Sequence, residues 1–570
     1  LHQRSLFNTV AVCVDGRLVA LVPKQRLAGD GIHYEPRWFK PWRPGVVGRS
    51  RCAGVDVPIG DLLVEVGGVR IGFEICEDAW VADRPGGRLA ARGADVICNP
   101  SASHFAFAKL PVRHRFVIEG SRAFACAYVY ANLLGNEAGR AIYDGGALIA
   151  NQGRLIAQGP RLGFADWGLT TARVDLGLGR MAQARSASFV PDLATDPGLV
   201  RVDHVWPEAA HAVETPPLLA AWETGTTVKE EEFTRALALA LFDYLRKSRS
   251  QGFVVSLSGG CDSTAVVLCI RAMVDLALAD LGGEGLRRRL AHLRDYPSDH
   301  TAAALTARLL TTVYQGTANS STTTRDAART IATAIGATHR ELDVESFVAA
   351  YVAAVSTALD RPLTWADDDL ALQNIQARAR APGVWLIANL EDKLLLATSN
   401  RSEAAVGYTT MDGDTCGGLS PIAGIDKAFL RRWLTWMETI GPHAHGPWPA
   451  LACVTTQAST PELRPQDAAQ QSEGDLMPFA ILDRIERLAI RDKLPPQAVL
   501  DRLAVECGEH PRERLRTWVV HFTRLWCRNQ WKRERFAPAF HLDDENLDPK
   551  TWCRFPILSG GFQQELAELT

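Results

Sequence analysis

The sequence predicts an α/β protein with two domains, the second of which is built on a doubly wound parallel sheet. Its 570 residues are more than one ordinary hydrophobic core accommodates. Short apolar runs and glycine-marked turns alternate up to about residue 202, whereas strand-like and helix-like segments alternate beyond residue 226. Residues 203–225 contain three prolines and little periodicity, as linkers do. We therefore expect domains at 1–202 and 226–570 with a linker at 203–225.

The first region is dominated by strands, because its apolar runs are short and rich in β-branched residues. The expected strands are 8–14, 17–22, 69–73, 94–99, 127–132 and 146–150. Helical patterns are fewer here, and the best of them is residues 111–125.

The second region begins with a helix at 227–248, which has acids in its first turn and basic residues at its end, as the helix dipole favours. Strands and helices then alternate, which implies a parallel sheet. The expected strands are 253–257, 309–314, 338–342 and 393–398, and the expected helices are 262–278 and 325–336, the latter closed by Gly336.

Composition excludes several classes of protein. A net charge of -3 gives no reason to expect a nucleic acid or an acidic membrane as partner, and no apolar stretch reaches the ~18 residues of a membrane span. The twelve cysteines form no CxxC pair, so zinc and redox motifs are poorly supported. Many of these cysteines lie in apolar surroundings, which favours reduced thiols and a cytoplasmic location.

The segment Ser258-Gly259-Gly260-Cys261-Asp262-Ser263 follows an expected strand and opens an expected helix. Backbone N–H groups at such a junction bind anions. The lysine of a Walker A loop is absent, and an aspartate beside phosphates would repel them unless Mg²⁺ lies between. We therefore expect Asp262 to bind Mg²⁺. The segment resembles the PP-loop of the ATP pyrophosphatases, in which Cys261 occupies the variable position.

Further motifs follow the PP-loop in a fixed order: LALQNIQARAR (370–380), LLLATSNRSEAAVGY (394–408), SPIAGIDK (420–427) and STPELRP (459–465). Together they resemble the NAD synthetases over most of residues 226–545. Thr398 and Glu403 follow a strand end, where open α/β sheets bind ligands, and Glu403 is expected as a second Mg²⁺ carboxylate.

The resemblance implies the remaining residues of this site. For ATP they are Ser258, Gly259, Gly260, Asp262, Ser263, Thr398, Lys427 and Thr460. For deamido-NAD they are Arg378 and Lys532, the latter closing over phosphates. Met411 and Gly418 stand where the family commonly has a lysine and an aspartate, and Asp412 and Asp414 remain alternatives for the acid.

In the first region, VRIGFEICEDAW (69–80) places Cys76 in an acid-flanked turn after a strand, which is typical of an exposed nucleophile. Glu74, Glu77 and Asp78 would raise the pKa of its thiol unless a cation offsets them, and Lys24 is available at the end of an earlier strand.

These segments, with YEPRWFKPW (34–42) and NPSASHFAFAK (99–109), resemble the nitrilase-type glutamine amidohydrolase domain fused to NAD synthetases. The resemblance implies an α-β-β-α sandwich, a Glu-Lys-Cys triad with Cys76 and Lys24, and glutamine contacts from Ser103 and Lys109. Glu35 matches a supporting glutamate. Because the catalytic glutamate of the family precedes the lysine by more residues than are present here, we expect a sequence incomplete at its N-terminus, with the sandwich truncated at its start.

The implied activity is amidation of deamido-NAD to NAD with ATP and with ammonia from L-glutamine, through an adenylated intermediate, by a homo-oligomer that needs Mg²⁺. Three alternatives remain: an ammonia-dependent synthetase with an inactive amidase domain, a synthetase for another acceptor, and a non-catalytic nucleotide-binding scaffold.

Overall fold

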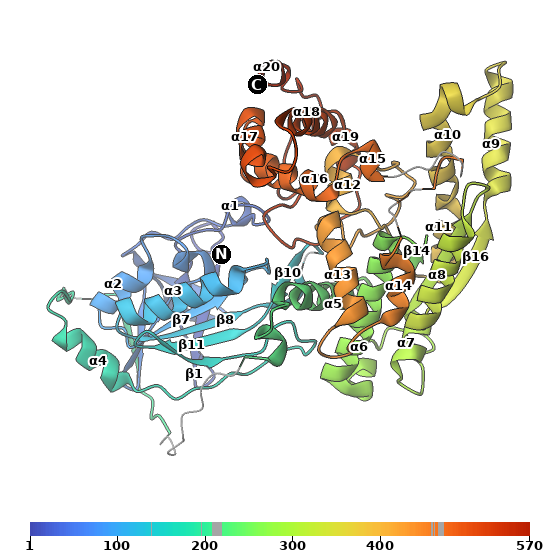
Figure 1. The fold of residues 1–570 in the computed structure, drawn as a ribbon. Helices are drawn as coiled ribbons and strands as arrows, with labels where there is room; N and C mark the ends of the chain where they lie inside the picture. Colours follow the sequence, from blue (N-terminus) through green and yellow to red (C-terminus); the bar gives the residue numbers. More distant parts are fainter. Residues whose placement is uncertain are drawn as a thin grey trace. The chain divides into compact units, whose positions relative to one another are not determined.

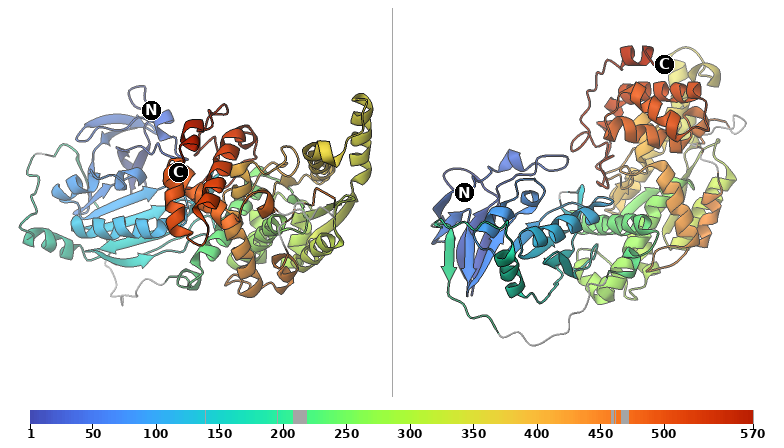
Figure 2. Two further views of the ribbon diagram at one scale, coloured as in Figure 1. Left: turned by 45° about the horizontal axis from the view of Figure 1, so that its top comes forward. Right: turned by 60° about the vertical axis from the view of Figure 1, so that its left-hand side comes forward.

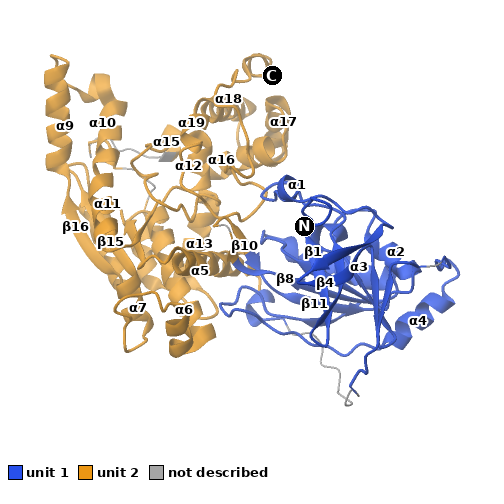
Figure 3. Ribbon diagram, turned by 180° about the vertical axis from the view of Figure 1, so that it is seen from behind, with its two compact units in different colours: residues 1–135, 143–224 blue, residues 136–142, 225–570 orange. Residues whose placement is uncertain are grey.

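The computed structural model describes residues 1–137, 139–194, 196–207, 219–457, 460, 462–465 and 472–569. The chain forms two units, each described by itself: residues 1–135 with 143–224, and residues 136–142 with 225–570. Figure 3 colours the two units. Residues 208–218 of the predicted linker lie outside the described residues. The predicted domains at 1–202 and 226–570 stay a prediction. In the described chain, no helix is long and apolar enough to span a membrane.

The first unit contains a larger and a smaller sheet. The larger sheet has the order β12-β11-β8-β7-β6-β5-β13 and mixes parallel pairs, such as β6–β7–β8, with antiparallel pairs, such as β5–β6 and β8–β11. Its strands are β5 Leu63–Val66, β6 Val69–Phe73, β7 Val96–Ser101, β8 Ala127–Asn132, β11 Ala147–Asn151, β12 Arg154–Gln158 and β13 Leu199–Val202. The smaller sheet has the order β1-β2-β4-β3, with β1 Thr9–Val14, β2 Arg17–Pro23, β3 Val47–Cys52 and β4 Val55–Gly60.

The core of this unit follows from the alternation of side chains along the strands. Val64 and Val66 of β5 pack with Val22 of β2 in a cluster between the two sheets. Leu63 instead packs with residues of α2 (Pro85–Ala91) and α3 (Lys109–Ala123), which cover the other face of the larger sheet.

The outer face of the smaller sheet carries Trp42 and Phe7, which pack near Ile59. Two further helices are α1 (Glu35–Trp38) and α4 (Leu176–Arg185). In the described residues the expected sandwich therefore appears as one helix layer and two sheets, without a second helix layer over the smaller sheet. The resulting fold is α/β with mixed sheets.

Residues 136–142 belong to the second unit although strands of the first unit flank them in the sequence. They lie in a two-stranded ribbon of β9 (Leu134–Glu137) and β10 (Ala141–Asp144). The Asn136 amide donates to Asp243 at 2.8 Å, and Arg140 pairs with Asp548 at 2.5 Å. The sequence alone did not predict that residues 136–142 belong to the second unit.

The sheet of the second unit is parallel, with the order β16-β15-β14-β17. Its strands are β14 Phe253–Ser256, β15 Leu310–Gly316, β16 Thr338–Asp343 and β17 Leu394–Leu396. Val254 packs against α11 on one face, and Phe253 and Val255 are fully buried on the other. The strand order reverses between β14 and β17, so the carboxyl ends of these two strands form the switch point where such sheets bind ligands.

Helices flank this sheet and continue beyond it. They are α5 Val228–Ser248, α6 Cys261–Arg289, α7 Ala302–Leu309, α8 Thr322–Ile335, α9 Glu345–Ala358, α10 Trp365–Ala379, α11 Ala381–Leu390, α12 Arg401–Val406, α13 Lys427–Thr439 and α14 Ala452–Thr455. Figure 1 and Figure 2 show α9 and α10 side by side at one edge of the unit.

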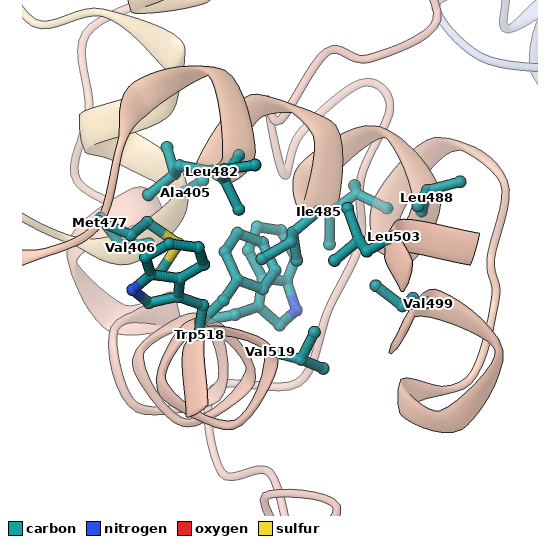
Figure 4. Close-up of a cluster of buried hydrophobic side chains, with 14 of the residues drawn as sticks. Ala405, Val406, Met477, Leu482, Ile485, Leu488, Val499, Leu503, Trp518 and Val519 are labelled. Atoms are coloured by element: carbon teal, nitrogen blue, oxygen red, sulfur yellow. The ribbon is translucent and has the colours of Figure 1, made fainter. Parts of the chain in front are cut away.

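A C-terminal helical bundle, for which the sequence pattern predicted no secondary structure, completes the second unit. Its helices are α15 Ser472–Asp475, α16 Phe479–Glu486, α17 Pro496–Glu506, α18 Arg512–Arg528, α19 Gln530–Arg533 and α20 Gln563–Ala567. Side chains of α16, α17 and α18 form one buried cluster with Ala405 and Val406 of α12 (Figure 4). The bundle therefore packs directly on the helix that carries Glu403.

Candidate active sites

Cys76 opens the 3₁₀ helix Cys76–Ala79, three residues after the end of β6. Its φ of +49° lies in the left-handed region, which is strained for a residue with a side chain and recurs at functional turns. The backbone amide of Ala102 donates a hydrogen bond to its sulfur.

The turn that presents Cys76 is held by the carboxylate of Asp78. This carboxylate accepts the amide hydrogens of Ile75 at 2.9 Å, Gln25 at 3.2 Å and Arg26 at 2.7 Å. Burial raises the pKa of Asp78 to about 6. Because Gln25 and Arg26 follow Lys24 directly, Asp78 joins the segment carrying the lysine to the turn carrying the cysteine.

Lys24 is 1% exposed and donates from Nζ to Glu35 Oε2 at 2.5 Å. Glu35 also accepts from Asn8 Nδ2 at 2.7 Å and from the Ala28 amide at 2.6 Å. The sequence-predicted pair of Lys24 and Cys76 thus lies together, with Glu35 fixing the lysine.

The pKa of the Cys76 thiol is raised from its ordinary value, and burial is the largest cause. Lys24 and the Ala102 amide act to lower it, while Glu35 and Glu77 act to raise it. Of the three acids expected to raise this pKa, Glu77 does so. Glu74 is instead fully buried and pairs with Arg84 at 2.6 Å, and Asp78 holds the turn. The thiol is therefore protonated near neutral pH.

Ser103 lies just beyond β7 in a segment that a buried ion pair holds. Arg113 donates to the carbonyl oxygens of Ser103 at 2.8 Å and His104 at 3.0 Å. Its other terminal nitrogen donates to both oxygens of Asp144, at 2.7 and 2.8 Å. Burial acts to raise the pKa of Asp144, but Arg113 and Arg161 hold it below its ordinary value.

Sequence reasoning missed two histidines beside Lys109. His33 Nε2 lies 3.0 Å from His104 Nδ1, and Lys109 Nζ lies 3.1 Å from His104 Nε2. Burial, followed by the charge of Lys109, lowers the pKa of His33 to about 4, so this imidazole is neutral at physiological pH. The sequence could have indicated them, because His33 lies two positions before Glu35 and His104 directly follows Ser103.

In the second unit, the predicted PP-loop joins β14 to the N-terminus of α6. Gly259 has a φ of +81°, and a Cβ there would lie 2.1 Å from the Thr324 carbonyl oxygen, so only glycine fits. Ser263 Oγ accepts the Ser258 amide at 3.2 Å and lies 3.1 Å from Ser258 Oγ. The loop and the long α6 together provide the donors of an anion site.

Lys427, at the start of α13, contacts both predicted metal ligands. Its Nζ donates to Asp262 and, at 3.1 Å, to Glu403 Oε1. Burial raises the pKa of Glu403 to about 7, with Asp262 and Asp414 adding to the rise and Lys427 opposing it. Burial acts to lower the pKa of Lys427, but the two carboxylates raise it well above its ordinary value.

The donor set fits Mg²⁺. Asp262 Oδ1 is buried and has no hydrogen-bond partner among the described residues, and Mg²⁺ usually takes one or two carboxylates together with substrate phosphates and water. No group of three or more potential metal ligands occurs in the described chain. A metal here would therefore complete its coordination from substrate and solvent.

Thr398 and Thr460 lie on two further segments, one that follows β17, the strand paired with β14, and one that contains Glu462. Thr398 follows β17 and is half-buried. Thr460 Oγ1 accepts the Glu462 amide at 3.3 Å, and Glu462 in turn binds Thr324 Oγ1 at 2.8 Å, beside Gly259. Ser459 and Pro461 of the predicted motif lie outside the described residues.

The predicted dinucleotide residues meet at the loop that follows α12. Arg378 donates to the Met411 carbonyl oxygen at 3.1 Å, and Lys532 donates to the carbonyl oxygens of Gly407 and Thr409 at 2.7 and 2.8 Å. Asp412 is exposed and pairs with Arg535.

Asp414 is exposed, as Asp412 is, but it is held in a different way. It accepts the Thr410 amide at 2.6 Å, and it lies near the charges of Lys532 and Arg380. Arg380, which sequence reasoning did not select, has a buried Nε without a hydrogen-bond partner in the described residues.

These geometries define an enzyme class that carries a thiol-dependent amidase site and a PP-loop nucleotide site on one chain. The carbon-nitrogen hydrolase family matches residues 2–185, and the NAD synthase family matches residues 233–520. The chain belongs to the glutamine-dependent NAD(+) synthetases, which are glutamine-hydrolysing ligases. The family, the α/β fold class and the enzyme class expected from the sequence are thereby confirmed.

Similar proteins span the whole chain. The glutamine-dependent NAD(+) synthetase of Oryza sativa subsp. indica is 30% identical over 94% of this chain and 77% of its own length. The crystal structure of the glutamine-dependent NAD(+) synthetase of Cytophaga hutchinsonii is 41% identical, with a TM-score of 0.78 over 99% of this chain and 84% of that one. The Acinetobacter baumannii enzyme, solved with adenosine diphosphate, shares the fold at 20% identity, with a TM-score of 0.54 over 98% of this chain and 83% of that one.

Proposed function

We propose that this chain hydrolyses L-glutamine at Cys76 and uses the ammonia, with Mg²⁺ and ATP, to amidate deamido-NAD at the PP-loop site. The products are NAD, glutamate, AMP and pyrophosphate. The observation that carries the proposal is that each half has its own buried lysine in contact with the groups it must serve: Lys24 with Glu35 near Cys76, and Lys427 with Asp262 and Glu403.

In the amidase half, the Cys76 thiolate attacks the glutamine carboxamide, ammonia leaves, and water hydrolyses the thioester to glutamate. Lys24 stabilises the tetrahedral oxyanion. Because burial keeps Cys76 protonated, a base must first take its proton. We assign Glu35 to positioning Lys24, since three hydrogen bonds already engage it. Ser103 and Lys109 bind the glutamine.

In the synthetase half, the nicotinate carboxylate of deamido-NAD attacks the α-phosphate of ATP and pyrophosphate leaves. Ammonia then attacks the acyl carbon of the adenylate, and AMP leaves. The ATP phosphates are held by Ser258, Gly259, Gly260, Ser263 and Lys427, and Thr398 and Thr460 also contact the nucleotide. Asp262 and Glu403 would hold Mg²⁺, which would supply positive charge against the departing pyrophosphate.

For the dinucleotide we propose Arg378 and Lys532, with Asp414 as the acid that replaces the family aspartate at Gly418. Asp414 is favoured over Asp412 because it lies near Lys532 and is held by the Thr410 amide, whereas Asp412 pairs with Arg535.

We also propose that the chain forms a homo-oligomer through α9. Phe347, Tyr351 and Val355 recur every fourth residue along this helix and are 59%, 53% and 46% exposed, and Leu359 extends the stripe. An apolar stripe of this kind marks an association surface. Phe347→Asp combined with Tyr351→Asp should yield a smaller species by analytical ultracentrifugation, and an unchanged mass would exclude α9.

A cytoplasmic location is proposed because the twelve cysteines, all within the described residues, are free thiols.

The proposed reaction is tested by its stoichiometry. Full-length protein with glutamine, ATP, Mg²⁺ and deamido-NAD should release NAD, AMP, pyrophosphate and glutamate with one AMP for each NAD. AMP release that does not depend on deamido-NAD would indicate another acceptor, and absence of turnover with either nitrogen source would favour a non-catalytic protein.

A further inference from the structure

The two residues that contact Asp262 or its lysine partner in the synthetase site, Glu403 and Lys427, come from the first turns of two helices, α12 and α13. Glu403 lies in α12, a helix of only six residues, and Lys427 is the first residue of α13. A six-residue helix has little intrinsic stability. The position of Glu403 must therefore be fixed by what packs on α12.

The first turns of α12 and α13 are joined through one carboxylate of the C-terminal bundle. Ser402 is fully buried, and its Oγ donates to Asp483 Oδ1 on α16. The same oxygen of Ser402 accepts the Lys427 amide at 2.9 Å. Asp483 Oδ2 accepts the Ala428 amide at 3.1 Å.

This arrangement places the connection directly behind the reactive groups. Ser402 precedes Glu403 in the chain, and the Lys427 amide is on the residue whose ammonium contacts Glu403 and Asp262. A shift of Asp483 would therefore move both first turns together.

The bundle also fixes the remainder of α12. Arg401, which is fully buried, pairs with Asp426, Glu486, Asp543 and Glu545. At the other end, Arg533 donates to the Ala405 carbonyl oxygen at 2.7 Å, and Asn529 donates to that of Val406 at 2.8 Å. The apolar face of α12 enters the bundle core (Figure 4).

We infer that Asp483, acting through Ser402, is a positioning residue that holds Glu403 and Lys427 in register with Asp262. The C-terminal bundle thus serves the ligase reaction as the support of its charged groups. This inference rests on the proposed function of the PP-loop site.

The test uses full-length protein with Ser402→Ala, Asp483→Asn and the double variant. The assay is NAD formation from ammonium, ATP, Mg²⁺ and deamido-NAD, which bypasses the amidase half. The matched control is Thr523→Val on α18, because the Thr523 hydroxyl is also buried in the bundle but, among the described residues, donates to the Val519 carbonyl oxygen of its own helix.

Misplacement of reacting groups by about 1 Å costs up to about 100-fold in rate, so we expect kcat to fall about 10- to 100-fold in each single variant, with the KM for deamido-NAD nearly unchanged. Since the two side chains act as one unit, the kcat of the double variant should be little lower than that of the less active single variant. Thr523→Val should retain the parent kcat even if its thermal midpoint falls.

Parent-like kcat in folded Ser402→Ala and Asp483→Asn would overturn the inference, as would an equal loss in Thr523→Val, which would mean a general loss of packing. If Asp483→Asn does not fold, Ser402→Ala alone decides. Failure of the proposed function is recognised separately, because then the parent itself would make no NAD from ammonium.

Discussion

Each of the two sites pairs a buried lysine with carboxylates, but the number of carboxylates differs between them. In the first unit Lys24 forms one ion pair, with Glu35. In the second unit Lys427 forms two, with Asp262 and Glu403, and the pKa of Glu403 is raised to about 7. A lysine paired with one carboxylate suits an uncharged carboxamide, whereas two carboxylates around one lysine suit a nucleotide that arrives with Mg²⁺. The two sites therefore differ in the number of carboxylates that contact the lysine.

Of the changes that test this comparison, removal of Lys427 should have the largest effect on activity. Lys427→Met leaves two partly buried carboxylates without their cation, which lowers the free energy of unfolding. It also removes a cation from the phosphates, so NAD formation from either nitrogen source should fall by at least about 100-fold. Arg325→Met, which breaks an exposed ion pair with Glu341 in the same unit, is the control and should stay near the parent. Parent-like synthesis by Lys427→Met would remove this lysine from the site.

The corresponding change in the first unit should affect one activity only. Lys24→Met removes one oxyanion donor, and glutamine-supported synthesis should fall about 100- to 1,000-fold while ammonium-supported synthesis is kept. Arg26→Met, two residues away, breaks only a partly exposed pair with Asp83 and serves as control. An equal fall with both nitrogen sources would contradict the separation of the sites.

Asp78 offers a measurement of stability against pH. Its pKa in the folded chain is about 6, against an ordinary value of 3.8, so its protonated form is the one that folding favours. This contribution is complete below about pH 3.8 and is lost as pH rises through 6, which amounts to about 3 kcal/mol. Relative to Asp78→Asn, the parent should lose stability over this window in calorimetric scans. A constant difference between the two would show that Asp78 does not titrate there.

The smallest expected effect concerns His33. Because its pKa is about 4, it should act as a neutral hydrogen-bonding group and give no inflection in the amidase pH profile between 6 and 8. His33→Asn should raise the KM for glutamine by about 2- to 10-fold, the worth of one hydrogen bond. NMR titration of the imidazole near pH 6.5 would contradict this assignment.

The parts of the fold that the sequence predicted well are those set by local pattern. The strands β6 and β8 begin and end where their β-branched runs do, at 69–73 and 127–132, because buried parallel strands are continuous apolar segments. Helix α6 runs to Arg289 rather than 278, since it continues through a kink at Gly282. The C-terminal bundle escaped prediction because its core is formed with α12, a partner far away in the sequence.

The residues of the candidate sites also fall into two groups, those that short motifs predict and those that depend on contacts in the folded chain. The PP-loop, Lys24 and Cys76 could be selected from short motifs. The contact of Lys427 with Asp262 joins residues 165 positions apart, and the hydrogen bond from the Thr410 amide that holds Asp414 depends on the folded loop. Charge pairing over such separations is a property of the folded chain.

The central claim is that one chain contains two separate sites, one that releases ammonia and one that consumes it. The most direct test is Cys76→Ala in the full-length protein, assayed for NAD formation with glutamine and with ammonium. We predict that glutamine-supported synthesis falls by at least about 1,000-fold, as loss of a nucleophile does, while ammonium-supported synthesis keeps the parent rate. Equal activity of the variant and the parent on glutamine would contradict the account.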